Sequence, residues 1–192
     1  MKVKPIIKAI REGKVILAPT DTVYGLLTDA TNKKAVEKVF KIKKRPRNKP
    51  LPIFVKDIKM AKELAEINEK QEKFLKKVWP GKTTAVLKLK IKPRSFVKSR
   101  RKIYGISKDT IALRIPKYKL VLDLLKRTDK PLTGTSANIS GQLASGNIKK
   151  VLKQFKNQRH QPDLVIDAGN LPKSKPSKVI DLTIWPPKIL RE

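Results

Sequence analysis

Short apolar runs and longer amphipathic segments alternate along this chain, and the alternation restricts the folds that it can adopt. The runs at 14–19, 51–55 and 111–116 are rich in β-branched residues and have the length of buried strands. Segments with a helical spacing of apolar residues lie between them, as at 118–127. This order predicts an α/β fold in which a twisted, mixed sheet is flanked by helices.

Capping residues mark where several of the predicted helices begin and end. A helix over 5–11 has a proline in its first turn and stops before Gly13. Asn32, Asp57 and Asn68 are of types that cap helix N-termini, and each precedes a helical pattern. We therefore expect helices to begin after these three positions.

The remaining segments are consistent with one domain. Residues 92–108 are basic and lack periodicity, which predicts a loop or flap, whereas 131–135 reads as one strand. From Asp163 onward, short strands are expected between turns that hold proline and serine. A chain of 192 residues with 39% hydrophobic residues suits one core, so 1–192 is predicted to be a single domain.

The chain carries an extreme positive charge. It has 47 lysines and arginines against 16 aspartates and glutamates, which gives a formal net charge of +31. Such a field attracts polyanions, including nucleotides and RNA. Because the lysines are scattered through nearly every segment, a solvated surface that reflects genome or habitat bias explains them as well as selected RNA contact does.

Composition excludes several kinds of site. The chain has no cysteine, which excludes disulfides, cysteine-ligated zinc and a thiol nucleophile. His160 is the one histidine, which excludes a histidine-centred triad and a multi-histidine metal site. No apolar run approaches the roughly 20 residues of a membrane span, and the N-terminus lacks a signal-peptide core. We expect a soluble, cytoplasmic protein without a membrane partner and without a metal held by protein ligands.

Four cationic side chains, those of Lys43, Arg45, Arg47 and Lys49, fall within one predicted helix end and loop. Arginine can fork onto phosphate oxygens and lysine adds a movable point charge, so the cluster suits a triphosphate. A solvated basic loop explains the same residues, and composition alone favours that explanation.

Two polar loops follow apolar segments. One is the run TSANISG at 135–141, in which Ser136 and Asn138 offer a hydroxyl and an amide, and the other contains Thr22 within PTDT. Loops of small hydroxyl, amide and glycine residues let a phosphate or a small polar substrate approach closely. Turns that only cap the next element use the same residue types, and from the residues alone such a turn is the favoured explanation for Ser136 and Asn138. Thr22 and Asp21 are similarly ambiguous, because TDT before an apolar run is also typical of a plain turn.

Arg114 interrupts an apolar strand. Burying a guanidinium is costly unless it meets an anion, so its head must reach a carboxylate, a phosphate or solvent. A substrate anion and an internal salt bridge to an aspartate explain it equally well.

An ordered series of motifs covers nearly the whole chain. In chain order the runs are PTDTVYGL, KKRPRNKPL, WPGKTTAVL, IALRIP, TSANISG, KPSKVIDLT and PPKILR. This series resembles the YrdC-like family of threonylcarbamoyl-AMP synthases. The resemblance implies the YrdC-like α/β fold with a basic concave face, and it makes a K-x-R pair (Lys43, Arg45) and an S-x-N pair (Ser136, Asn138) the catalytic signatures.

The resemblance also implies a reaction and a set of ligands. Threonine and bicarbonate or CO2 give a carbamate, whose oxygen attacks the α-phosphorus of ATP and releases pyrophosphate, with Mg2+ bound alongside ATP. A downstream transferase complex would use the product to modify tRNA. The residues expected around ATP are Lys43, Arg45, Lys49, Thr110, Ser136, Asn138 and Arg191. Those expected around threonine are Thr22, Arg114, Gly134 and Ser177.

The chain departs from the family pattern at several positions. Phe54 stands where many relatives have a histidine, Lys82 replaces a turn proline, and Lys178 replaces a threonine. These departures and the net charge motivate an alternative, a non-catalytic YrdC-like module that binds tRNA or other RNA. A third hypothesis, hydrogenase-maturation carbamoyl transfer, uses a similar domain in long chains with cysteine zinc modules, and the short, cysteine-free sequence argues against it.

Overall fold

A computed structural model describes residues 3–90 and 102–192 of the chain. Most of the loop predicted at 92–108 lies outside the described residues, and its described part, 102–108, contains no helix or strand. Within the described ranges, no helix combines the length and the apolar character needed to cross a membrane.

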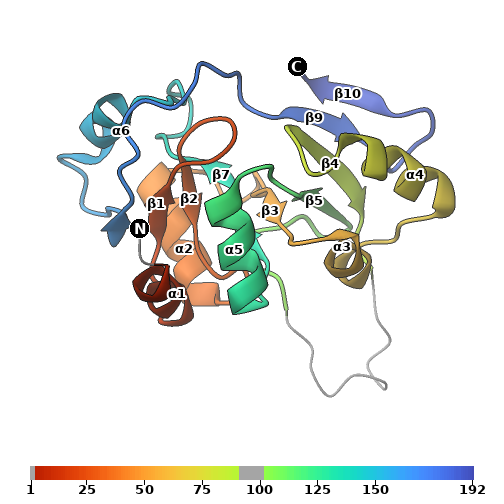
Figure 1. The fold of residues 1–192 in the computed structure, drawn as a ribbon, viewed down its shortest axis with the longest axis horizontal. Coiled ribbons are helices and arrows are strands. Elements are labelled where there is room, and N and C mark those ends of the chain that lie inside the picture. The colour runs from red at the N-terminus through yellow and green to blue at the C-terminus, as the bar shows by residue number, and fades with distance from the viewer. Residues whose placement is uncertain (1–2, 91–101) are drawn as a thin grey trace.

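The strands form two mixed sheets where the sequence predicts one (Figure 1). A four-stranded sheet has the order β7 (Thr135–Ser136), β2 (Gly25–Leu27), β1 (Ile16–Ala18) and β8 (Leu164–Val165). A six-stranded sheet has the order β10 (Lys188–Arg191), β9 (Lys178–Asp181), β4 (Thr83–Lys88), β5 (Thr110–Arg114), β3 (Ile53–Phe54) and β6 (Leu132–Thr133). Each sheet contains both parallel and antiparallel pairs, so the mixed character is confirmed.

Gly134 joins the two sheets. The predicted strand at 131–135 is divided there, because β6 pairs with β3 while β7 pairs with β2. The Gly134 amide donates to the Pro52 carbonyl at 2.8 Å. A Cβ at this position would lie 2.4 Å from the ring of Phe54, so only glycine lets the chain pass this close to the aromatic side chain.

Six helices flank these sheets in the described chain: α1 (Lys4–Arg11), α2 (Lys33–Lys43), α3 (Ile58–Leu64), α4 (Glu69–Val78), α5 (Lys119–Thr128) and α6 (Ile148–Phe155). The three predicted caps are confirmed, because Asn32, Asp57 and Asn68 each accept a hydrogen bond from a backbone amide in the first turn. Helix α6 and strand β2 were not among the predicted elements. Figure 1 shows α1, α2 and α6 beside the four-stranded sheet and α3 and α4 beside the six-stranded sheet.

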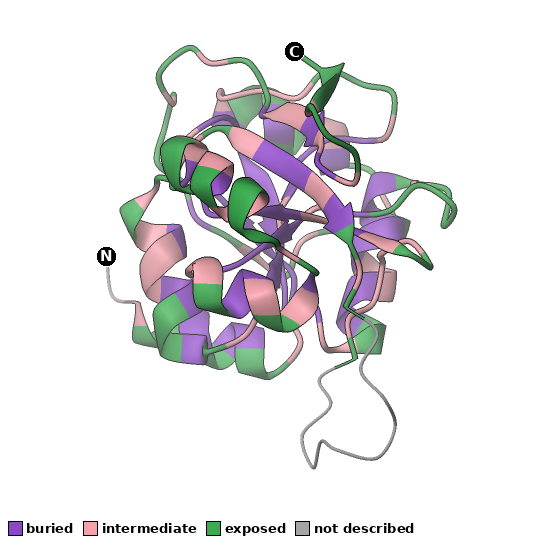
Figure 2. Cartoon of the chain, turned by 90° about the vertical axis from the view of Figure 1, so that its right-hand side faces the viewer, coloured by how far each residue is buried: buried purple, intermediate pink, exposed green. Residues whose placement is uncertain are grey.

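Alternation along β5 decides which of its side chains join the core. Ile111, Leu113 and Ile115 pack with α3 and α4 in one buried cluster. Arg114 therefore lies on the opposite face of the strand. Burial also differs between strands. Figure 2 shows buried strands inside the molecule and the exposed β10 at its rim near the C-terminus.

Candidate functional site

Lys43 joins the K-x-R segment to the S-x-N segment. Its Nζ donates hydrogen bonds to the Ser136 carbonyl at 2.6 Å and to both the carbonyl and the Oδ1 of Asn138 at 3.0 Å. Helix α2 brings the lysine there, because its preceding apolar residues pack in the core and carry the last turn inward. Residues 93 and 95 positions apart are thus bonded directly.

The Ser136–Gln142 loop is held by its own side chains. The Ser136 hydroxyl donates to Asn138 Oδ1 at 2.6 Å, and Asn138 Nδ2 donates to the carbonyls of Ile139 and Gln142. From α6, Gln154 accepts the Ile139 amide at 3.0 Å. The amide of Asn138 and the ammonium of Lys43 therefore shape this loop with their own hydrogen-bonding groups.

Lys43 is 1% exposed, which makes it one of the most buried cations of the described chain. Burial, and to a smaller degree the charge of Arg45, lower the pKa of its ammonium from its usual value to about 7. No carboxylate of the described residues lies within ion-pair distance of it. Both protonation states are therefore accessible near neutral pH.

Arg45 leaves the end of α2 at an αL turn on Lys44. Its guanidinium donates to the carbonyls of Lys49 and Pro50 at 2.9 and 3.0 Å, so it closes the basic loop. The side chain of Lys49 is exposed, and Arg47 forms an exposed ion pair with Glu37 at 3.6 Å. Of the four predicted loop cations, Lys43 and Arg45 are the two that the structure holds in place with several hydrogen bonds.

Arg114 has the internal salt bridge that the sequence leaves open. Its Nη2 donates to Asp21 Oδ1 at 2.6 Å and its Nε donates to the Gly81 carbonyl at 2.8 Å, while the side chain is 3% exposed. Asp21 also accepts the Lys117 amide at 2.9 Å. Burial lowers the pKa of Arg114, and the nearby Asp21 opposes that shift. Within the described chain, no hydrogen bond engages its Nη1.

Phe54 forms a wall beside this arginine. The guanidinium carbon of Arg114 lies 5.6 Å from the centre of the Phe54 ring, within the range of a cation–π contact. The ring also lies against Gly134, where a Cβ would come within 2.4 Å of it. Phe54 thus places an apolar ring beside the guanidinium, and the missing Cβ of Gly134 leaves room for that ring.

Arg191 reaches the same region from β10. It donates to the Ser177 carbonyl at 2.7 Å, and the Ser177 hydroxyl is bonded to Thr84 at 2.9 Å. Its positive charge lowers the pKa of Arg45 and Arg114, in both cases after the larger effect of burial. Arg45, Arg114 and Arg191, called the arginine cluster below, therefore share one electrostatic neighbourhood.

Thr22 and Thr110 make fewer contacts with the other predicted site residues through their side-chain hydrogen bonds. The Thr22 hydroxyl is bonded to that of Thr20 at 3.1 Å inside the turn before β2. Thr110 begins β5 and shares a strand face with Arg114, but among the described residues no hydrogen bond joins its side chain to another predicted site residue. Of these two, only Thr22 lies beside a residue bonded to Arg114.

Sequence reasoning singled out neither Thr84 nor Gly81, and it left Asp21 ambiguous. Thr84 and Gly81 belong to the WPGKTTAVL run. The place of this run in the motif series was the signal that could have made them candidate site residues. Gly81 contacts Arg114 through its backbone carbonyl, which every residue type has, so its residue type could not predict this contact.

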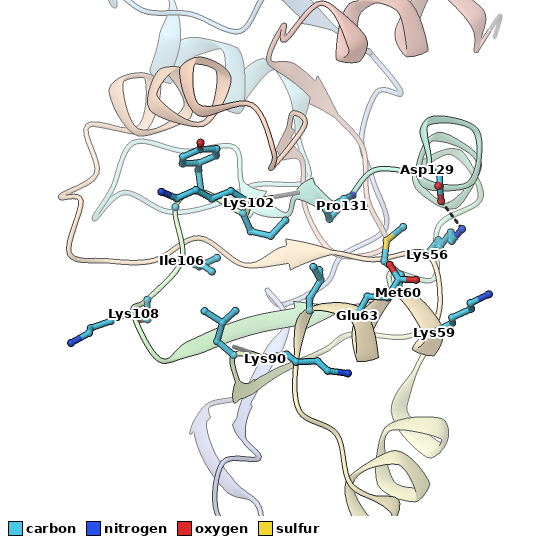
Figure 3. A pocket seen from close by; sticks show the side chains of 16 residues that line it. Lys56, Lys59, Met60, Glu63, Lys90, Lys102, Ile106, Lys108, Asp129 and Pro131 are labelled. Carbon is cyan, nitrogen blue, oxygen red and sulfur yellow. Dashed lines mark hydrogen bonds and ion pairs between the residues drawn. The ribbon is translucent and has the colours of Figure 1, made fainter. Parts of the chain in front are cut away.

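Two cavities are lined by other residues. One, of about 910 Å3, is bordered by Lys56, Met60, Lys90, Lys108 and Asp129 among others, and Figure 3 shows the Lys56–Asp129 ion pair at its side. The second, of about 820 Å3, is lined by Phe74, Val78, Ile180 and Ile189 together with several lysines. No predicted site residue lines either of these two cavities, so the candidate site is defined by its bonding and charge.

Comparison with known proteins identifies the fold and family. The family model for Sua5, YciO and YrdC proteins, described as telomere recombination, matches residues 8–192. A threonylcarbamoyl-AMP synthase of Pyrococcus abyssi is 38% identical over 183 residues, which cover 95% of this chain and 51% of the relative. One from Vibrio vulnificus is 30% identical over 177 residues, covering 85% of this chain and 91% of the relative.

A solved structure agrees with these matches. The crystal structure of P. abyssi Sua5 complexed with L-threonine superposes with a TM-score of 0.83 at 37% identity, over 98% of this chain and 53% of that one. The chain thus spans about half the length of the Pyrococcus protein and most of the Vibrio protein. The motif series and the fold both agree with these relatives, and the chain belongs to the Sua5/YciO/YrdC family.

Proposed function

We propose that this protein is a threonylcarbamoyl-AMP synthase, which forms threonylcarbamoyl-AMP and pyrophosphate from L-threonine, bicarbonate or CO2, and ATP. One observation carries the proposal: the K-x-R and S-x-N segments converge through three hydrogen bonds from Lys43, next to the arginine cluster. Relatives that cover most of this chain bear the same activity in their names.

Threonine binding is assigned to the region around Arg114. The Nε and Nη2 groups of this arginine are bonded within the described part of the chain, where no hydrogen bond engages Nη1, so Nη1 can meet the threonine carboxylate. Thr22 and Ser177 border the region through Asp21 and Arg191, respectively. The solved complex of P. abyssi Sua5 with L-threonine supports a threonine site in this fold.

The proposed catalysis depends on fixed positive charges that stabilise the negative charge of the reacting groups. In the proposed step the carbamate oxygen forms a bond to the α-phosphorus of ATP. The bond between that phosphorus and the oxygen that bridges it to the β-phosphorus breaks, and this oxygen leaves with pyrophosphate. Nucleophile and leaving group are both negative, so fixed cations that hold them together and stabilise developing charge supply most of the rate. Arg45 and Arg191 are assigned to the phosphates, and Ser136 is assigned a hydrogen bond from its hydroxyl. Lys43 contributes its positive charge from its buried position against the Ser136–Gln142 loop.

Mg2+ fits this site as a companion of ATP. Among the described residues there is no group of three acidic or histidine side chains that could hold a metal ion. Mg2+ often binds through nucleotide phosphates and water with few protein ligands, so this donor set is compatible with a Mg2+–ATP complex. When bound, the ion would neutralise phosphate charge. A transferase that modifies tRNA is the expected consumer of the product.

Pyrophosphate release tests the proposal. Purified protein with Mg2+, ATP and bicarbonate should release pyrophosphate when threonine is added, and glycine or serine should support much less release. The adduct itself is to be identified by mass spectrometry. If folded protein releases no pyrophosphate yet binds tRNA with a steep salt dependence, the RNA-binding module replaces this proposal.

A further inference from the structure

The hydrogen bonds of Lys43 require its side chain to be a protonated ammonium group. Its Nζ faces three acceptors, namely two carbonyls and the side-chain oxygen of Asn138, at 2.6 to 3.0 Å. An ammonium has three N–H donors and satisfies all three, whereas a neutral amine has two. The observed loop geometry is therefore that of the protonated lysine.

The surroundings of Lys43 oppose that proton. Arg45, which follows α2, is the charged group that acts on it most directly, and it repels the ammonium. The packed segments add Gln154 of α6, which is neutral, and Tyr24, which precedes β2 and whose hydroxyl is bonded to Gly169 and Ala168. Burial lowers the pKa of Lys43 to about 7, and no carboxylate of the described residues lies within ion-pair distance to oppose the shift.

We propose that the proton on Lys43 holds the Ser136–Gln142 loop in the conformation that accepts a polyphosphate, which makes Lys43 a positioning residue controlled by pH. The choice of ligand rests on the proposed function, and the loop switch does not. Loss of the proton removes one of the three donors, so either Ser136 or Asn138 loses its bond and the loop loosens. A bound polyphosphate adds negative charge nearby and favours the proton, so nucleotide binding should be accompanied by proton uptake.

Calorimetric titration with ATP, in excess Mg2+, between pH 6.5 and 9 tests the coupling. Affinity should be nearly constant below pH 7 and should fall by up to about tenfold per pH unit above it. Repeating the titration at pH 8 in two buffers of different ionisation enthalpy should reveal proton uptake. Lys43→Arg keeps a permanent charge and should give a flat profile, and Lys43→Met should bind weakly at every pH.

Lys41→Met is the matched control, because it removes an exposed lysine from the last turn of the same helix. It should keep the wild-type pH profile. If Lys43→Arg or Lys43→Met shows the same fall in affinity as the wild type, the proton responsible is elsewhere and the proposal is wrong.

A second measurement needs no nucleotide. The amides of 136–142, followed by hydrogen exchange corrected for the intrinsic effect of pH, should lose protection between pH 7 and 9 in the wild type and not in Lys43→Arg.

Lysine 13Cε chemical shifts test the protonation directly. The Lys43 signal, identified by its absence from Lys43→Met, should titrate near neutrality. A Lys43 signal that titrates with the exposed lysines, or protection that does not change, overturns the switch even if synthase activity is present. A confirmed switch without synthase activity overturns only the proposed function.

Discussion

Single residues of the candidate site divide into those that hold the chain and those that are free to hold a ligand. Among the described residues, Lys43 and Asn138 have their donors engaged within the loop, while Arg114 has two of its nitrogens bonded and its Nη1 without a hydrogen bond. Family resemblance assigns all three to ligands without this distinction. The hydrogen-bonding pattern makes substitutions at these positions differ in how they affect folding and activity.

Arg45→Ala should reduce activity far more than stability. Its bonds go to carbonyls of its own loop, Lys49 and Pro50, so little core packing depends on it. We expect a loss of about 100-fold or more in kcat/KM for ATP, with a free energy of unfolding within about 1 kcal/mol of wild type. Pyrophosphate release and urea denaturation measure the two effects, with the exposed Arg47→Ala as control. Equal losses in both would make Arg45 a structural residue.

Gly134→Ala should destabilise the junction of the sheets. The new methyl would lie 2.4 Å from the Phe54 ring, and the ring, 2% exposed, has little room to move. A cost of about 2 kcal/mol is expected, and combining the change with Phe54→Leu should recover part of it. Gly146→Ala, whose nearest neighbour would be the Leu171 side chain at 3.3 Å, is the control. Thermal denaturation of Gly134→Ala, Phe54→Leu, the double variant and Gly146→Ala checks the coupling, which would be absent if the effects of the two single changes simply add.

At the scale of elements, the site depends on loops that bridge the sheets. The turn before β2 supplies Asp21 to the end of β5, and the loop after β7 receives Lys43 from the end of α2. Each contact crosses more than 90 residues of sequence, so the site requires both sheets to be in place. Local patterns identified the loops but not their partners.

Asp21→Asn should weaken the link between the β2 turn and β5. It leaves the Arg114 guanidinium buried without a carboxylate, and an unpaired buried charge is strongly destabilising. We expect a loss of about 3 kcal/mol in the free energy of unfolding. Glu37→Gln, which breaks the exposed pair with Arg47, should have a much smaller effect. Chemical denaturation of both variants tests this, and an equally small loss for Asp21→Asn would show that Arg114 finds another partner.

For the whole molecule, the net charge of +31 should make stability depend on salt. Self-repulsion opposes the compact state, and salt screens it over about 10 Å at 0.1 M. Raising NaCl from 20 to 500 mM should therefore stabilise the fold by about 1–2 kcal/mol, or about 5 °C in melting temperature. Scanning calorimetry in NaCl, with sucrose at matched osmolality as control, measures this. A melting temperature that falls with salt would show that attractive pairs dominate the surface.

Much of the fold and family could be read from the sequence, because the relevant signals are local. Caps at Asn32, Asp57 and Asn68 depend on a side chain meeting an amide three residues away, and strand runs depend on adjacent apolar residues. Helix α6 was not predicted although Asn147 caps it, because the polar and glycine residues that follow Ser136 are also typical of a loop. The motif order then identified the family that the comparisons confirm.

The sequence by itself determined the alternation of elements, the identity of the charged and polar residues, and the family. Only the tertiary structure decided that β6 and β7 belong to different sheets, that Arg114 pairs with Asp21, and that Lys43 is buried with no carboxylate of the described residues beside it. The physical reason is separation along the chain. Hydrogen bonding and burial at these positions depend on partners about 90 residues away, and a residue type alone specifies neither the partner nor the solvent exposure that sets its charge.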